Sequence, residues 1–178
     1  MIEDTIAAIA TPIGEGALAV IRLSGKNALT IAAECFKPIG NSSSSPTEAA
    51  THTVHYGKIV SGEIEIDEVL ISVMLAPRTF TRENVVEITC HGGMVASRSV
   101  LQAVLSSGAR SAQPGEFTRR AFINGRIDLA QAEAVSDVIQ AHTDLALAAA
   151  NEQLGGKLSQ RINHLRADLL HPLAHIEA

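Results

Sequence analysis

Aromatic side chains are scarce in this sequence. It has four phenylalanines, one tyrosine and no tryptophan among 178 residues, although 46% of its residues are hydrophobic. We therefore expect an aliphatic, alanine-rich core in one domain, or in one domain plus part of another. No apolar run reaches the roughly 18 residues of a membrane span, so we predict no membrane association.

Cysteine is rarer still, with two residues. Cys35 and Cys90 are far apart and lack the spacing of metal ligands, and the first residues are acidic with no signal-peptide pattern. Both features predict a cytoplasmic protein with two reduced thiols.

Two features of nucleotide-binding proteins are also missing. The net charge is −5, whereas proteins that bind phosphate backbones by themselves are usually basic, so any RNA contact should be local or supplied by a partner. The only Gly-Lys pairs, at Gly25 and Gly156, lack the leading glycine and the following Ser or Thr of a P-loop. We predict that this chain alone neither binds nor hydrolyses GTP.

The first two thirds of the chain mix strand and helix patterns without regular alternation. We predict an α+β domain over residues 1–118, with a flexible Ser-rich loop at 40–46. The expected strands are 5–10, 17–23, 52–60, 64–75, 85–90 and a short edge strand at 109–112; the expected helices are 26–36 and 94–105.

From Glu116 onward the pattern is helical, and we assign residues 119–178 to the first segment of a truncated helical domain. Leucines and isoleucines from Leu154 to Ile176 recur every three or four residues, which predicts a helix over 143–176 about 50 Å long, with Gly155-Gly156 as its weak point. One such helix cannot bury its own apolar seam. We expect the sequence to be a fragment, or its missing helices to come from another chain.

Residues 113–134 predict two helices joined by a tight turn. A short helix at 116–123 should end at Asn124-Gly125, and Asp128 should begin the next helix, with Gln131 at the spacing of a capping box. Arg126 lies in the loop between the two helices, where it is either a ligand-binding group or an ordinary surface arginine.

Two strand residues are further candidates for a binding site. In 85–90 the alternation places Val86, Ile88 and Cys90 on one face and Glu87 on the other. Glu87 is then either an ordinary exposed carboxylate or an acceptor for a ligand edge with adjacent N–H donors, such as a pterin.

Arg22 continues the row of Leu18 and Val20, so it needs a carboxylate, backbone carbonyls or a ligand; a structural ion pair is the alternative to a binding role. His91-Gly-Gly93 reads as a structural turn rather than as the site of a general base, because no nucleophile is visible beside it.

Four motifs in order resemble the N-terminal part of the tRNA-modification GTPases called MnmE or TrmE. They are Ala10–Gly16 after Asp4-Thr-Ile, Arg22–Gly25, Thr79–Gly93 and the 113–134 segment. The resemblance implies a tetrahydrofolate-binding domain that forms a homodimer and binds 5-formyl- or 5,10-methylene-tetrahydrofolate at Arg22, Glu87 and Arg126.

The sequence departs from the family pattern at four positions. The family usually has Lys at the position of Arg126, which keeps the charge but changes its geometry. It has Gly at the position of Arg82, Asp at the position of Asn84 and Arg at the position of Gln113, and these changes concern local loop shape.

For the whole protein, the resemblance implies a hydrolase acting on GTP, with Mg and K in a GTPase domain outside this sequence. With an FAD-containing partner, such proteins install a carboxymethylaminomethyl-type group on the wobble uridine of tRNA. Two alternatives stay open: a self-standing folate-dependent aminomethyl- or methyltransferase domain, and a dimerisation module without a ligand.

Overall fold

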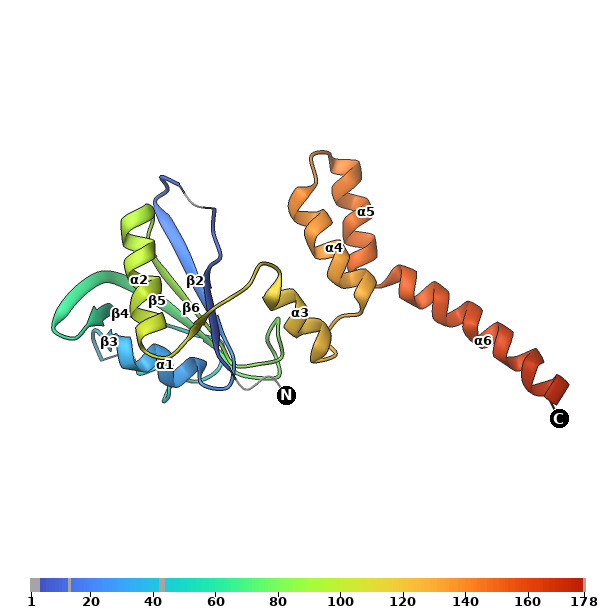
Figure 1. Cartoon of the computed structure of the whole chain (residues 1–178), viewed down its shortest axis with the longest axis horizontal. Helices are drawn as coiled ribbons and strands as arrows, with labels where there is room; N and C mark the ends of the chain where they lie inside the picture. Colours follow the sequence, from blue (N-terminus) through green and yellow to red (C-terminus); the bar gives the residue numbers. More distant parts are fainter. Residues whose placement is uncertain (1–3, 13, 42–43, 178) are drawn as a thin grey trace. The chain divides into compact units, whose positions relative to one another are not determined.

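The computed structural model describes residues 4–12, 14–41 and 44–177, with the backbone alone from residue 171 onward. The chain divides into two compact units, Met1–Phe117 and Thr118–Ala178 (Figure 1). The fold class predicted from the sequence is confirmed: an α+β unit is followed by helices.

The first unit is built on one seven-stranded sheet in the order β3-β4-β5-β6-β2-β1-β7. All neighbouring strands are antiparallel except β1 and β7, which are parallel. The strands are β1 (Ile6–Ile9), β2 (Leu18–Ser24), β3 (Phe36–Pro38), β4 (Thr53–Ser61), β5 (Ile64–Met74), β6 (Val85–His91) and β7 (Arg110–Ser111).

Two helices, α1 (Ala28–Cys35) and α2 (Met94–Ser106), cover one face of this sheet (Figure 1). Their apolar sides join the inward-facing residues of β2, β5 and β6 in one aliphatic core, which includes Ile21, Ile71 and Ile88. Because side chains alternate across a strand, the residues between these positions lie on the opposite face of the sheet.

One strand was absent from the sequence-based prediction. The residues of β3 follow α1 directly and pair with β4 at the sheet edge, with Phe36 opposite Ile59. A three-residue strand that ends in Pro38 has no period of its own, so only the pairing with β4 defines it.

The second unit contains α4 (Leu129–Gln140), α5 (Asp144–Leu154) and α6 (Lys157–Glu177); α3 (Glu116–Ile123) contains the division between the units. The predicted capping box is confirmed. The Gln131 backbone N–H donates to Asp128 Oδ1 at 2.9 Å, and the Asp128 N–H donates to Gln131 Oε1 at 3.0 Å.

The prediction of one helix over 143–176 is wrong. The helix stops at Leu154, and α6 begins at Lys157, because Gly156 adopts a left-handed conformation with φ +81°. Gln131 Nε2 also donates to the Leu154 carbonyl at 2.8 Å, which satisfies an acceptor that a continuing helix would have used.

Candidate functional site

Arg22 and Glu87 are direct neighbours on adjacent strands of the first unit. They occupy opposite positions of β2 and β6, on the sheet face that α1 and α2 do not cover. The alternation predicted for Glu87 is confirmed, since Val86, Ile88 and Cys90 are buried in the core. The structure therefore brings together two of the three residues predicted for the site.

The two side chains form a close ion pair. Arg22 Nε donates to Glu87 Oε1 at 2.7 Å, and Arg22 Nη2 lies 2.7 Å from the same oxygen. The second oxygen, Oε2, accepts no hydrogen bond from the part of the chain that the structure describes. The side chains are 34% and 28% exposed, so a ligand can reach the pair.

Phe117 adds an aromatic contact that the sequence analysis did not assign to the site. The Arg22 Cζ lies 5.7 Å from the centroid of the Phe117 ring, within the range of a cation–π interaction. Phe117 lies in the helix predicted at 116–123, and nothing local in the sequence links that position to Arg22.

A polar cluster supports the end of β2 beyond Arg22. The buried Ser24 hydroxyl hydrogen-bonds Thr81 Oγ1 at 2.6 Å and donates to Glu83 Oε2 at 2.7 Å. Arg82, between these partners, has φ +58°. The position at which the resembling family has glycine is therefore left-handed in this chain.

Arg126 belongs to the second unit, whereas Arg22 and Glu87 belong to the first. It follows Gly125, whose φ of +68° confirms the predicted helix stop, and its side chain is exposed. Its backbone N–H donates to the Ala121 carbonyl at 2.9 Å. Its predicted role in the site stays a prediction.

His91 ends β6 and is held by Asp67 of β5. Its Nδ1 lies 2.6 Å from Asp67 Oδ1, and its backbone N–H donates to Oδ2 at 2.8 Å. The hydrogen bond to this carboxylate raises the pKa of His91 above its ordinary value. The next residue, Gly92, lies so close to Gly16 that a side chain would collide with the Gly16 carbonyl, which accounts for a small residue in this turn.

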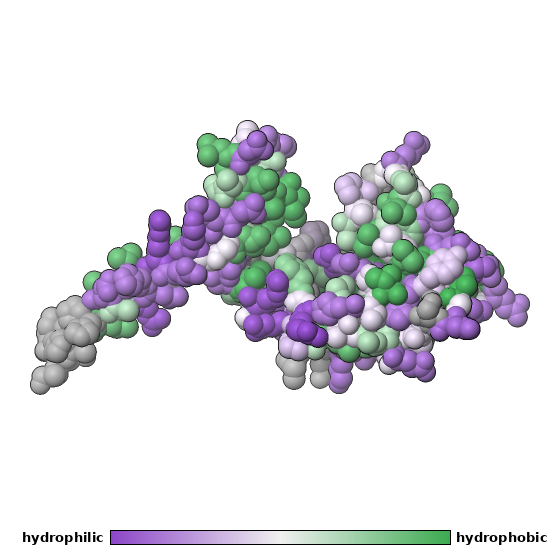
Figure 2. Space-filling view, turned by 180° about the vertical axis from the view of Figure 1, so that it is seen from behind, coloured by the Kyte–Doolittle hydropathy of each residue, from purple (hydrophilic) through white to green (hydrophobic). Residues whose placement is uncertain are grey.

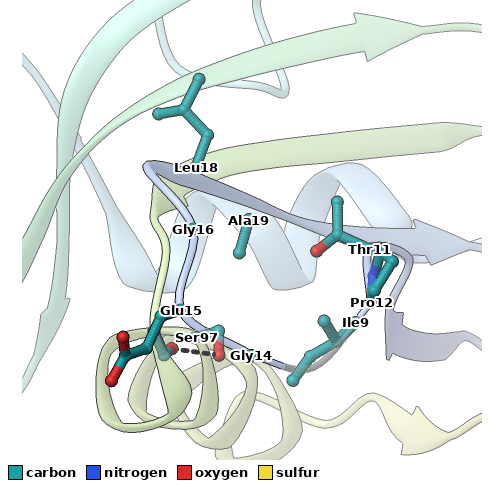
Figure 3. Close-up of a pocket in the computed structure, with 10 residues that line it drawn as sticks. Ile9, Thr11, Pro12, Gly14, Glu15, Gly16, Leu18, Ala19 and Ser97 are labelled. Carbon is teal, nitrogen blue, oxygen red and sulfur yellow. Dashed lines mark hydrogen bonds between the residues drawn. The ribbon is translucent and has the colours of Figure 1, made fainter.

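A pocket of about 280 Å³ lies elsewhere in the first unit (Figure 3). It is lined by the β1–β2 connection, including Thr11 and Glu15, and by Ser97 of α2. Ser97 donates its hydroxyl hydrogen to the Gly93 carbonyl at 2.7 Å. Neither Arg22 nor Glu87 lines this pocket, and its volume is below the usual range for small-molecule sites.

Among the described residues, no group of three or more His, Cys, Asp or Glu side chains is arranged to hold a metal ion. No described helix is both long enough and apolar enough to span a membrane.

Comparison with known proteins gives matches along nearly the whole chain. Residues 5–126 match the family described as GTP-binding protein TrmE N-terminus, and residues 129–178 match the MnmE helical domain. The tRNA modification GTPases MnmE of Bacillus licheniformis and Geobacillus thermodenitrificans are 56% identical over 177 residues and 57% identical over 178. The MnmE of Bacillus subtilis is 55% identical over 177 residues. Each alignment covers 98% of this chain but only 38% of the relative's length.

Proposed function

Because the chain belongs to the MnmE (TrmE) family of tRNA modification GTPases, we propose that its first unit binds a reduced folate at the Arg22–Glu87 pair. The ligand class is 5-formyl- or 5,10-methylene-tetrahydrofolate, which supplies a one-carbon unit when bound. The observation that carries the proposal is the carboxylate of Glu87, paired through one oxygen and open at the other.

The chemistry of these residues fits a pterin. A carboxylate only accepts hydrogen bonds, so Glu87 Oε2 can receive an N–H from the 2-amino-4-oxo edge of the ring. Arg22 holds Glu87 through Oε1 and offers further N–H donors to carbonyl oxygens. Arg126 is proposed as a third binding residue, its cation serving a polar or anionic part of the ligand.

We propose that the first unit also forms a homodimer through the uncovered sheet face. Tyr56, Leu70, Thr89 and Val20 form one row across four strands by register, and Val54 and Leu18 lie beside it. Several of these apolar side chains are substantially exposed; Leu18 and Val54 are the most exposed, at 64% and 60%. Exposed apolar side chains gathered on one face of a sheet favour a protein interface.

For the whole protein we propose the activity in the relatives' name, a tRNA-modifying GTPase. The chain spans 38% of those relatives and has no P-loop motif, so GTP, Mg and K would bind outside these 178 residues. We also propose that the whole protein acts with an FAD-containing partner, that it modifies the wobble uridine of tRNA, and that it is located in the cytoplasm.

Titration calorimetry with 5-formyltetrahydrofolate tests the folate site. Glu87→Gln should weaken binding roughly 30- to 1,000-fold, because the amide loses a charged acceptor and can place a donor against the pterin N–H edge. Arg22→Ala should weaken it as well.

The matched control is Glu65→Gln, which removes another cross-strand pair, Lys58–Glu65, without touching the site. Thermal melts should show all variants folded, since an exposed ion pair contributes little stability. Equal affinity of folded Glu87→Gln and the unmodified chain would leave Arg22–Glu87 as a structural ion pair only. Absence of any folate binding would favour the dimerisation module without a ligand.

A further inference from the structure

We propose that Phe117 is a positioning residue of the folate site, whose ring fixes the Arg22 guanidinium against Glu87. This inference rests on the folate site proposed above. Its structural basis is the 5.7 Å separation between Arg22 Cζ and the ring centroid, together with the two 2.7 Å contacts from Arg22 to Glu87 Oε1.

Arg22 needs more than Glu87 to hold one geometry. Both side chains are about one third exposed, and an ion pair in that environment is weak because water competes for it. The Arg22 side chain also has several rotatable bonds whose freedom opposes any single arrangement. An aromatic face beside the planar guanidinium restricts its tilt and favours its position electrostatically.

The ring itself is well placed to do this because the preceding residue is fixed. The Glu116 carboxylate is only 1% exposed and accepts from Arg110 Nη1 and Nη2 at 3.1 and 2.7 Å. It also accepts from the Gln113 backbone N–H at 2.8 Å, and Arg110 Nη2 lies 2.6 Å from Asp4. These bonds set where α3 begins, and therefore where the Phe117 ring lies relative to β2.

A fixed Arg22 determines which oxygen of Glu87 the ligand can reach. With Arg22 held at Oε1, the carboxylate is oriented while Oε2 stays available to the ligand. If Arg22 were free to rotate, it could cover Oε2 or leave the carboxylate without its partner, and each ligand molecule would have to reorder the pair on binding.

The experiment compares Phe117→Leu, which keeps apolar volume but loses the ring, with Phe117→Tyr, which keeps the ring. Affinity for 5-formyltetrahydrofolate should fall about three- to tenfold in Phe117→Leu and change less than about twofold in Phe117→Tyr. In an Arg22→Ala background, Phe117→Leu should weaken binding no further, because its effect passes through Arg22.

An NMR measurement without ligand provides a second readout. The Arg22 δ-protons should carry a ring-current shift that Phe117→Leu removes and Phe117→Tyr keeps. Two results would overturn the proposal. One is that adding Phe117→Leu to Arg22→Ala lowers the affinity by the same factor as in the unmodified chain. The other is that Phe117→Leu leaves the Arg22 δ-proton resonances unchanged. If the unmodified chain binds no folate, the proposed function fails, while the NMR comparison still decides whether Phe117 positions Arg22.

Discussion

Arg22 and His91 each meet a carboxylate across the sheet, but the two pairs differ in what they leave available. In the Arg22–Glu87 pair, Arg22 contacts one carboxylate oxygen with two nitrogens, and the other oxygen accepts no hydrogen bond from the described residues. The His91–Asp67 pair instead contains a histidine whose pKa is raised by its hydrogen bond to Asp67, so the contribution of this pair to stability depends on pH.

The His91–Asp67 pair should make stability depend on pH. Asp67 raises the pKa of His91 in the folded protein above the unfolded value of about 6.5. The stabilisation is therefore complete below that value and lost as pH rises through the folded pKa. Thermal melts should show that Asp67→Asn lowers the melting temperature more at pH 6 than at pH 8.5. A pH-independent difference between the two proteins would contradict this.

The left-handed conformation of Arg82 should lower the stability of the protein, because it carries a side chain at this position. At φ +58° a β-carbon is unfavourable, and glycine is not. Replacing Arg82 by Gly and by Ala removes the same side-chain contacts in both variants, so their difference isolates the backbone effect. Urea unfolding should show the Gly variant more stable than the Ala variant by about 1 kcal/mol. An Ala variant of equal or greater stability would argue against strain at this position.

At the scale of elements, residues at the helix ends determine where the helices of the second unit begin and stop, and the apolar period of the helix interiors does not. The apolar period continues past residue 154, yet the chain leaves the helix at Gly155-Gly156. Gln131 connects the start of α4 with the end of α5, because it closes the capping box of α4 and donates to the last carbonyl of α5.

Loss of the capping box should destabilise α4 and the hairpin that it forms with α5. Hydrogen bonds from Ser159 and from the Gln131 backbone lower the pKa of Asp128, so the cap is charged at neutral pH. Asp128→Ala should lower the free energy of unfolding by about 1 kcal/mol, whereas Asp128→Asn keeps an acceptor and should cost less than about half as much. Denaturation followed by far-UV circular dichroism measures both. Equal losses in the two variants would show that capping is not the cause.

At the scale of the whole molecule, each unit has exposed apolar side chains on its surface. Apolar side chains gather on the surface of the helical unit (Figure 2), where Ile139 and Leu145 are about four-fifths exposed. In the first unit, the row through Leu70 and Tyr56 lies on the uncovered face of the sheet.

A charge in this sheet row should dissociate the proposed homodimer. We expect light scattering at micromolar concentration to give a dimer for the unmodified chain and a monomer for Leu70→Asp, since an unpaired carboxylate would have to be desolvated in the interface. Val95→Asp is the matched control, because Val95 is an exposed apolar residue of α2, on the helix-covered side of the sheet. A monomeric unmodified chain, or a Leu70→Asp variant that stays dimeric, would exclude this interface.

Local patterns in the sequence determined most elements and the faces of their residues. Period-two alternation placed Glu87 opposite the buried Val86 and Ile88, and the Asp128–Gln131 spacing identified a helix start correctly. These features depend on residues within a few positions of one another. The four family motifs likewise identified the family from the sequence alone.

Only the tertiary structure decided which distant residues meet. Arg22 and Glu87 are 65 positions apart, and their contact follows from the register of β2 against β6. The Phe117 ring reaches Arg22 from a third element, and β3 exists only through its pairing with β4. Strand register and packing depend on many weak contacts between segments that are far apart in the sequence. They therefore cannot be read from the spacing or composition of any one segment.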